Sequence, residues 1–236
     1  MSEQNFDLYR DIAKRTDGDV YIGVVGPVRT GKSTLISRMM EELVLSRMAA
    51  GPRRERLTDE LPQSGSGKTI MTTQPKFVPS EAVSVTLDDQ SSVRVRMVDS
   101  VGYLVEGALG TEEDGASRMV HTPWFDYDVP FEQAAEIGTR KVITDHATIG
   151  LVVTTDGSIA DLSREAYQPP EERVVRELKE IGKPFILILN SRHPEAEETL
   201  ALRQRLSERY GVPALSLNVK EMGLTEIQQV FEEVLY

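Results

Sequence analysis

A stretch of eight residues near the N-terminus has the residue types and spacing of a phosphate-binding loop. Residues 26–33 read Gly-Pro-Val-Arg-Thr-Gly-Lys-Ser and fit the pattern G-x-x-x-x-G-K-[ST]. In such a loop Gly26 and Gly31 permit a tight backbone, and successive N–H groups converge on phosphate oxygens. Lys32 brings a positive charge to the outer phosphates, and the Ser33 hydroxyl suits Mg²⁺. The sequence therefore predicts a nucleoside triphosphate site that uses Mg²⁺.

A second motif follows a later hydrophobic stretch. Residues 99–102 read Asp-Ser-Val-Gly, which gives D-x-x-G. In nucleotide hydrolases an aspartate at this point holds Mg²⁺, and the N–H of the glycine can meet the γ-phosphate. We therefore expect Asp99 to be a metal-linked catalytic residue and Gly102 to be a nucleotide-binding one.

Two further candidates for catalysis lie close to these motifs in the chain. Thr72 and Thr73 belong to residues 47–80, a polar stretch that we expect to be a long mobile loop. One of the two is predicted to bind Mg²⁺ and to sense the γ-phosphate, and the residues alone do not choose between them. Arg29 lies within the phosphate loop, where a guanidinium can neutralise charge in the transition state. The alternative is that Arg29 points to solvent or pairs with a carboxylate elsewhere.

The motif with which many P-loop proteins read guanine is incomplete. Asn190 ends an apolar stretch at the place of N-K-x-D, but residues 191–193 are Ser-Arg-His. The lysine that stacks on the base and the aspartate that reads guanine are both missing, so ATP is the predicted nucleotide. Tyr103 stands where many small GTPases carry the glutamine that orients water. Hydrolysis is therefore expected to be slow, or to depend on Arg29, a loop threonine or a partner.

The elements that must position these residues follow from hydrophobic patterns. An apolar run at 20–25 predicts a buried strand before the phosphate loop, and helical spacing over 34–45 predicts a helix after it. Alternation over 83–87 and 93–98 predicts a β-hairpin. Further strands are expected at 149–154, 185–189 and 213–217, and helices at 131–146, 169–181, 195–210 and 225–235. The pattern indicates an α/β P-loop NTPase fold, a mostly parallel six-stranded sheet with one antiparallel hairpin strand and helices on both faces.

Composition limits the kinds of partner and site. The chain has 236 residues and a net charge of −11, which argues against nucleic acid as a partner because phosphate backbones need a basic face. It has no cysteine, so disulfides are excluded, and its three histidines are scattered. Residues 1–15 are polar rather than a signal peptide, and no apolar run approaches the roughly 18 residues of a membrane span. We therefore expect a soluble, cytoplasmic protein.

A single domain over residues 1–236 is the simplest organisation, with an insertion at about 103–148. This insertion contains a cluster of aromatic residues, for which two interpretations are open. They either form a small satellite core or provide a surface for self-association. The cluster consists of Trp124, Phe125, Tyr127 and Phe131.

Longer runs of the sequence resemble a known family. The order of the motifs is similar to that of the translation-factor-related GTPase class, and the loop around Arg29 is similar to that of guanylate-binding proteins, where the arginine acts in cis. More specific runs resemble the N-terminal ATPase domain of the stage IV sporulation protein A family over essentially the whole chain. They include TIMTTQPKFVP, VDSVGY, HTPWF, FEQAAEIGTRKVITDHATIG and GKPFILILNS.

The resemblance implies a function and a biological setting. A member of this family is expected to hydrolyse ATP and to couple hydrolysis to self-assembly of the basement layer of the spore coat, on the forespore surface in the mother-cell cytoplasm. The implied partners are a small amphipathic membrane-bound sporulation peptide and other coat proteins, met through regions outside this chain. Because family members are longer, we expect the chain to be a fragment limited to the ATPase domain, with the C-terminal domains absent.

Motifs and resemblance together give the expected site. The catalytic residues are Arg29, Lys32, Thr72, Thr73 and Asp99. The ATP-binding residues are Gly26, Val28, Arg29, Thr30, Gly31, Lys32, Ser33, Thr34, Gly102 and Asn190. The metal ligands are Ser33, Thr73 and Asp99. Two alternatives stay open: a GTPase switch with an unusual base pocket, and a nucleotide-binding scaffold with little hydrolysis.

Overall fold

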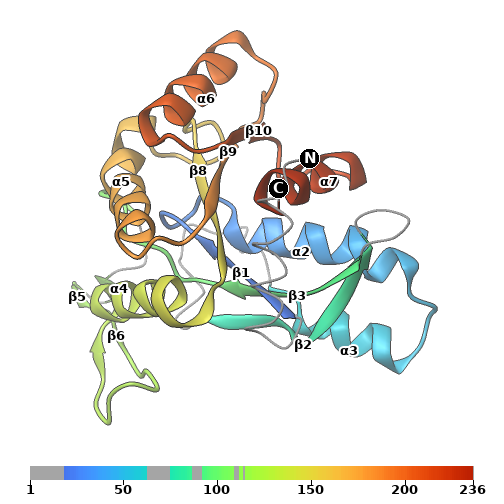
Figure 1. Cartoon of the computed structure of the whole chain (residues 1–236). Helices are drawn as coiled ribbons and strands as arrows, with labels where there is room; N and C mark the ends of the chain where they lie inside the picture. Colours follow the sequence, from blue (N-terminus) through green and yellow to red (C-terminus); the bar gives the residue numbers. More distant parts are fainter. Residues whose placement is uncertain (1–18, 63–74, 87–91, 109–111, 114, 236) are drawn as a thin grey trace.

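The computed structural model describes residues 19–62, 75–86, 92–108, 112–113 and 115–235. Its centre is a six-stranded sheet in the order β10-β9-β8-β1-β3-β2 (Figure 1). The parallel strands are β1 (Asp19–Val25), β3 (Ser92–Asp99), β8 (Ile149–Thr155), β9 (Phe185–Asn190) and β10 (Ala214–Leu217). The remaining strand, β2 (Lys76–Thr86), is antiparallel to β3. The predicted α/β fold is confirmed, including the single antiparallel hairpin strand.

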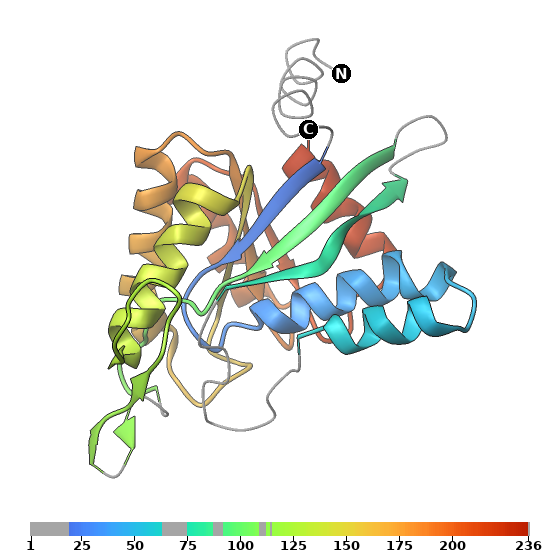
Figure 2. The same cartoon turned by 90° about the horizontal axis from the view of Figure 1, so that it is seen from below.

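Helices cover both faces of the sheet. On one face α2 (Lys32–Leu43) and α7 (Leu224–Leu235) bury Met39 and Val230 against Ile22 of β1. On the other face α5 (Arg164–Glu180) and α6 (Glu197–Tyr210) bury Val174 and Leu206 against Leu187 of β9. Figure 2 shows α4 and α5, in yellow and orange, on the opposite side of the sheet from α2, in blue. The strands are therefore apolar on both sides, as parallel strands in such sheets usually are.

The prediction that residues 47–80 form one long loop is wrong. This stretch contains the end of a 3₁₀ turn (Leu45–Arg47), the helix α3 (Pro52–Glu60) and the start of β2. Pro52 occupies the first turn of α3, where its missing N–H costs nothing, and Leu57 is the buried residue of the helix. The Gly51-Pro52 pair marks a helix start rather than a loop. Residues 63–74 lie outside the described part of the chain.

Helix α5 also departs from the prediction, because it begins at Arg164 rather than at Pro169. Both Pro169 and Pro170 lie inside it. Prolines in a helix interior remove backbone hydrogen bonds, so sequence reasoning placed them at the start. Tyr167 and Pro170 are buried, and this tertiary packing extends the helix towards its N-terminus.

The segment between β3 and β8 carries its own small core. It contains the helix α4 (Phe131–Lys141), which continues as a π-helical turn (Val142–His146), and two pairs of two-residue strands. The pairs are β4 (Glu112–Glu113) with β5 (Ala116–Ser117) and β6 (Met119–Val120) with β7 (Val129–Pro130).

Aromatic residues of this segment differ in their surroundings. Phe131 is fully buried in a third hydrophobic cluster that includes Val28 of the phosphate loop, and Phe125 packs against that cluster. Tyr127, by contrast, is 63% exposed. The cluster joins the segment to the phosphate loop, which is how a satellite core is expected to act. Within the described residues, no helix is long and apolar enough to cross a membrane.

Candidate active site

The phosphate loop links the carboxyl end of β1 to the first turn of α2, and its backbone explains its glycines. Gly26 and Gly31 have φ angles of 138° and 96°, in the region that favours glycine. A Cβ at Gly26 would lie 2.2 Å from the Val153 carbonyl oxygen, and one at Gly31 would lie 2.4 Å from Asn190 Nδ2. Arg29 also has a positive φ, of 62°, in an uncommon conformation for a non-glycine residue. The loop is thus fixed in shape by close backbone approaches.

Lys32 is buried at the start of α2. Its Nζ donates a hydrogen bond to the Pro27 carbonyl oxygen at 2.6 Å, and Thr30 Oγ1 donates to the same oxygen at 3.0 Å. Burial lowers the pKa of Lys32 to about 8, although nearby Asp99 acts in the opposite direction. A buried ammonium with so little compensation is a strong attractor for a phosphate anion.

Ser33 and Asp99 form the part of the site that fits a metal ion. Ser33 Oγ donates to Asp99 Oδ2 at 2.6 Å, across from the first turn of α2 to the end of β3. The other oxygen, Asp99 Oδ1, is buried and lacks a hydrogen-bond partner among the described residues. Burial raises the pKa of Asp99, against the opposing effects of Ser33 and Lys32. A cation would complete the compensation of this carboxylate, which Ser33 and Lys32 provide only in part.

The residues present fit Mg²⁺ rather than a metal held wholly by protein. A hydroxyl and a carboxylate are oxygen ligands of the kind that Mg²⁺ takes, together with waters and substrate phosphates. No group of three or more His, Cys, Asp or Glu side chains within the described ranges could hold an ion alone. Thr73, the third expected ligand, and Thr72 lie outside the described residues.

The D-x-x-G segment lies directly against the phosphate loop. The Val28 N–H donates to the Tyr103 carbonyl oxygen at 2.9 Å. A Cβ at Gly102, whose φ is 99°, would lie 2.5 Å from Lys32 Nζ and 2.6 Å from the Gly26 carbonyl oxygen. Gly102 therefore borders the space around the lysine ammonium. Its N–H donates to Thr139 Oγ1 at 2.9 Å, a contact that sequence reasoning missed.

Tyr103 is turned away from the site. Its side chain is only 2% exposed, its hydroxyl donates to Glu177, and the Arg173 guanidinium lies 4.1 Å from its ring centroid. Burial, aided by Glu177, raises the pKa of the phenol. The expectation that Tyr103 does not take the place of a water-orienting glutamine agrees with this geometry.

Asn190 acts on the protein itself. Its Nδ2 donates to the Thr30 carbonyl oxygen at 2.9 Å, and its Oδ1 accepts the Val219 N–H at 3.1 Å. The side chain is 5% exposed, so it joins the phosphate loop to the chain that follows β10. Asn190 was predicted to bind ATP, and the structure places it behind the phosphate loop, with its amide nitrogen and its amide oxygen each hydrogen-bonded to the protein.

Arg29 and Thr34 flank the centre of the site. Arg29 is half-buried and makes no ion pair with a described residue, so its guanidinium is not committed to a carboxylate there. The neighbouring Val28 shares a hydrophobic cluster with Tyr167 of α5. Burial raises the pKa of the Tyr167 phenol, and the charge of Arg29 acts in the opposite direction. Thr34 is half-buried in the first turn of α2.

Asp156 organises the loops at the ends of β8 and β9, and the sequence search overlooked it. Its Oδ2 accepts the Ser191 hydroxyl at 2.6 Å, and its Oδ1 accepts the Ser158 N–H at 2.9 Å and the Ser158 hydroxyl at 2.6 Å. Burial alone would raise the pKa of Asp156, but the hydrogen bonds from Ser158 and Ser191 outweigh it, and the pKa lies below its usual value. The available signal was an Asp-Gly pair directly after a predicted strand.

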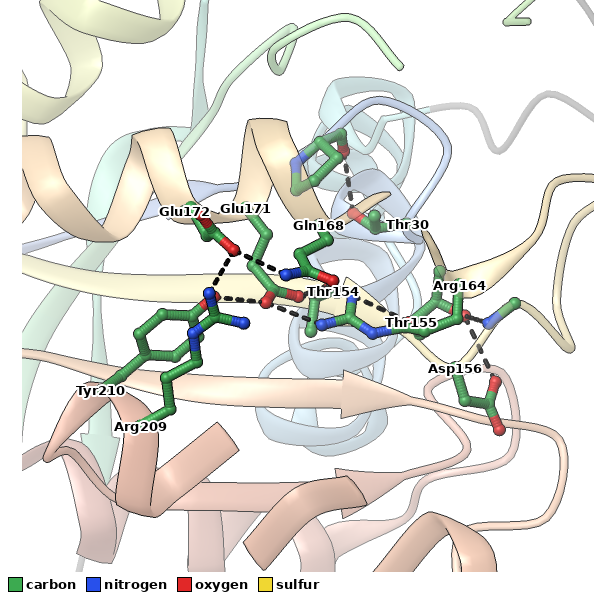
Figure 3. Close-up of polar contacts among 12 residues, drawn as sticks. Thr30, Thr154, Thr155, Asp156, Arg164, Gln168, Glu171, Glu172, Arg209 and Tyr210 are labelled. Carbon is green, nitrogen blue, oxygen red and sulfur yellow. Dashed lines mark hydrogen bonds and ion pairs between the residues drawn. The ribbon is translucent and has the colours of Figure 1, made fainter. Parts of the chain in front are cut away.

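The buried carboxylate of Glu171 connects α5 to β8, close to the loops that Asp156 organises. Figure 3 shows Arg164 and Glu171 converging on Thr154. Glu171 is fully buried, and its Oε2 lies 2.6 Å from Arg164 Nη1, while its Oε1 accepts the Tyr210 hydroxyl at 2.7 Å. This cluster holds α5 against the strand whose Val153 carbonyl meets Gly26.

Comparisons with known proteins identify relatives. Residues 3–236 match the family described as Stage IV sporulation protein A, ATPase domain. The chain is 56% identical over 232 residues to a Stage IV sporulation protein A of Clostridioides difficile (strain 630), covering 98% of this chain and 47% of that protein. It is 53% identical over 233 residues to the protein of the same name from Bacillus subtilis (strain 168), covering 99% of this chain and 47% of that protein. The chain thus spans about half the length of the curated relatives it matches.

A solved structure supports the fold. A GTP-binding protein from the archaeon Sulfolobus solfataricus, crystallised with GDP, superposes with a TM-score of 0.50 at 13% identity. The match covers 98% of this chain and 56% of that one. At this level of identity the likeness concerns the fold alone.

Proposed function

Since the chain belongs to the family of stage IV sporulation protein A ATPase domains, we propose that it hydrolyses ATP to ADP and phosphate with Mg²⁺ as its cofactor. The observation that carries this proposal is the cluster of Lys32, Ser33 and Asp99 at the first turn of α2. It combines a buried ammonium, a hydroxyl and a carboxylate with one buried oxygen that lacks a described partner. An anionic phosphate and a cation together complete this set.

Each residue has a role in the proposed reaction. Lys32 would hold the outer phosphate oxygens, and Ser33 and Asp99 would hold Mg²⁺, which would offset negative charge on the phosphates. Arg29, which forms no ion pair with a described carboxylate, would stabilise charge that develops in the transition state. Thr72 or Thr73 would sense the γ-phosphate and would be a further ligand of the metal.

ATP is the proposed substrate because the edge that would read guanine lacks the groups to do so. The amide nitrogen of Asn190 donates to Thr30 and its amide oxygen accepts from Val219, and residues 191–193 supply no carboxylate. Asp156, the nearby carboxylate, already accepts hydrogen bonds at both oxygens.

For the full-length protein we propose that hydrolysis drives self-assembly of the spore coat basement layer. The support is membership of a family whose named relatives are sporulation proteins, and these relatives are about twice as long as this chain. The setting would be the mother-cell cytoplasm, at the outer surface of the forespore. A small amphipathic membrane-bound sporulation peptide and other coat proteins are the proposed partners, through regions beyond the matched half.

A second candidate is a nucleotide-binding scaffold with very slow hydrolysis. It is favoured by Tyr103, which points into the core and leaves no group after D-x-x-G to orient water. In this case the chain would retain ATP without releasing phosphate.

Competition and turnover, measured on the same sample, separate these candidates. We expect unlabelled ATP with Mg²⁺ to displace a fluorescent ATP analogue at a much lower concentration than GTP does, and phosphate to be released from ATP over many turnovers. A clear preference for GTP would instead support a GTPase switch. Tight ATP binding with at most one phosphate released per chain would support the scaffold.

A further inference from the structure

Three of the polar groups around the phosphate site, on Lys32, Ser33 and Gly102, are hydrogen-bonded to the protein itself. Lys32 Nζ donates to the Pro27 carbonyl oxygen, and Ser33 donates to Asp99. The N–H of Gly102 donates to Thr139 Oγ1 at 2.9 Å. A bound triphosphate must therefore replace some of these contacts with its own. Of these contacts, the one at Gly102 connects the site to α4, an element outside it.

Thr139 belongs to α4, in the segment between β3 and β8, and is fully buried. Its hydroxyl reaches Gly102 at the point where that residue borders Lys32, since a Cβ on Gly102 would lie 2.5 Å from Lys32 Nζ. The lysine of a phosphate loop reaches the β- and γ-phosphates. The Gly102 amide is thus close to the position of the terminal phosphate, but in this structure its hydrogen bond is made to α4.

We propose that Thr139 is a positioning residue that competes with the terminal phosphate for the Gly102 amide. An amide has one hydrogen, and a well-aligned hydrogen bond uses it for one acceptor. A triphosphate offers an anionic oxygen, a stronger acceptor than a hydroxyl. A diphosphate leaves Thr139 as the acceptor, so the threonine sets how strongly the site prefers ATP over ADP. This inference rests on the proposed ATPase function and deepens it.

The contact also ties the site to two helices. Glu136, one turn before Thr139 on α4, forms an ion pair with Arg173 of α5. Arg173 lies over the ring of Tyr103, the residue that follows Gly102. When the Gly102 amide bonds to phosphate instead, its direct hydrogen bond to α4 is lost. The helices α4 and α5 are therefore the elements whose contacts change when a triphosphate binds.

Nucleotide binding by Thr139→Val tests the proposal. The change keeps the shape of the side chain but leaves the Gly102 N–H without its acceptor in the free and ADP-bound forms, whereas the triphosphate form is unaffected. We expect the affinity for the non-hydrolysable triphosphate AMPPNP, with Mg²⁺, to rise about tenfold relative to that for ADP, the effect of one unsatisfied buried amide. Thr139→Ser, which keeps the hydroxyl, should retain the parent ratio.

A matched control is Thr122→Val, since Thr122 is also buried but its hydroxyl has no hydrogen-bond partner among the described residues. An unchanged AMPPNP-to-ADP ratio in Thr139→Val, or an equal loss for both nucleotides, would overturn the role of Thr139 while leaving the ATPase proposal intact. A parent chain that binds neither nucleotide would overturn both.

A second measurement needs no variant. The backbone amide signal of Gly102, followed by ¹H–¹⁵N NMR in the 236-residue chain, should move when AMPPNP binds with Mg²⁺ and stay near its free position with ADP. The same amide shift with both nucleotides would contradict the proposed exchange.

Discussion

Single residues in this site owe their properties to the few partners that surround them. Lys32 has a lowered pKa because it is buried with a carbonyl and one carboxylate nearby, and Asp99 has a raised pKa because it is buried with a single hydroxyl donor. Each charge is therefore only partly compensated by the protein. A phosphate anion would compensate the charge of Lys32, and Mg²⁺ would compensate that of Asp99. Binding of a nucleotide with Mg²⁺ is therefore favoured at these two residues.

We predict that Asn190 contributes mainly to the stability of the folded chain rather than to nucleotide binding. Asn190→Ala leaves the Thr30 carbonyl and the Val219 N–H buried without a partner, and we expect the free energy of unfolding to fall by about 2–3 kcal/mol. Urea denaturation measures this change. The control is Asn218→Ala, which removes a surface hydrogen bond to Glu221 and should cost about 0.5 kcal/mol or less. Equal stability of the two variants would refute the role of Asn190.

The lowered pKa of Asp156 predicts that the contribution of Ser191 to stability depends on pH. Because the folded-state pKa of Asp156 lies below its usual value of 3.8, its stabilisation is present above pH 3.8 and is lost as the pH falls through the folded-state pKa. Ser191→Ala removes one hydrogen-bond donor to the carboxylate. It should cost about 1 kcal/mol at pH 7, a value reduced by partial exposure, and clearly less near pH 2. Urea denaturation at both pH values checks this, and a cost that stays constant would count against it.

How far the site could be predicted depends on the distance along the chain between its parts. The phosphate loop and D-x-x-G are local patterns, and the structure brings Lys32, Ser33, Asp99 and Gly102 together as the motifs require. Thr139 meets Gly102 only because α4 folds back over the loop. A lone threonine in a helical pattern gives no sign of that contact, so sequence reasoning had no means to find it.

Among the elements, α5 shows how tertiary contacts override local preference. Its two interior prolines argue for a helix start, yet the helix extends to Arg164. Tyr167 packs into the hydrophobic cluster that contains Val28, and Arg164 pairs with Glu171, which accepts a hydrogen bond from Thr154 of β8. In the helix α3 the local signal was correct, because Gly51-Pro52 is a typical helix start, but residues 47–80 were interpreted as a loop. Strand positions were easier, because apolar runs of strand length between turn signals have few other interpretations.

Glu171 is the residue on which the docking of α5 depends most. Glu171→Ala leaves Arg164 without its carboxylate and removes the acceptor for the Thr154 and Tyr210 hydroxyls. Breaking a buried pair in this way should lower the free energy of unfolding by about 3–5 kcal/mol. Glu172→Ala, at the next position, removes a partly exposed ion pair with Arg209 and should cost about 1 kcal/mol or less. Urea denaturation of both variants decides, and similar losses would contradict this account.

The six-stranded sheet brings the groups of the site together at the carboxyl ends of its parallel strands. Parallel strands β1, β3, β8 and β9 present their carboxyl ends together, and ligands of open α/β sheets bind at such ends. The alternation of strands and helices predicted this arrangement. The packing of the segment between β3 and β8 was not predictable in detail, because its short strands give no periodic signal.

We propose that ATP hydrolysis at the carboxyl ends of these strands depends on Lys32 and Asp99. The most direct test is the rate of phosphate release from ATP with Mg²⁺ by the 236-residue chain and by its Lys32→Ala and Asp99→Ala variants. We expect each variant to be at least about 100-fold slower than the parent, since each loses a charge on which transition-state stabilisation depends. Lys179→Ala, at an exposed position on α5, should match the parent. Variants at Lys32 and Asp99 that release phosphate as fast as the parent would contradict the claim.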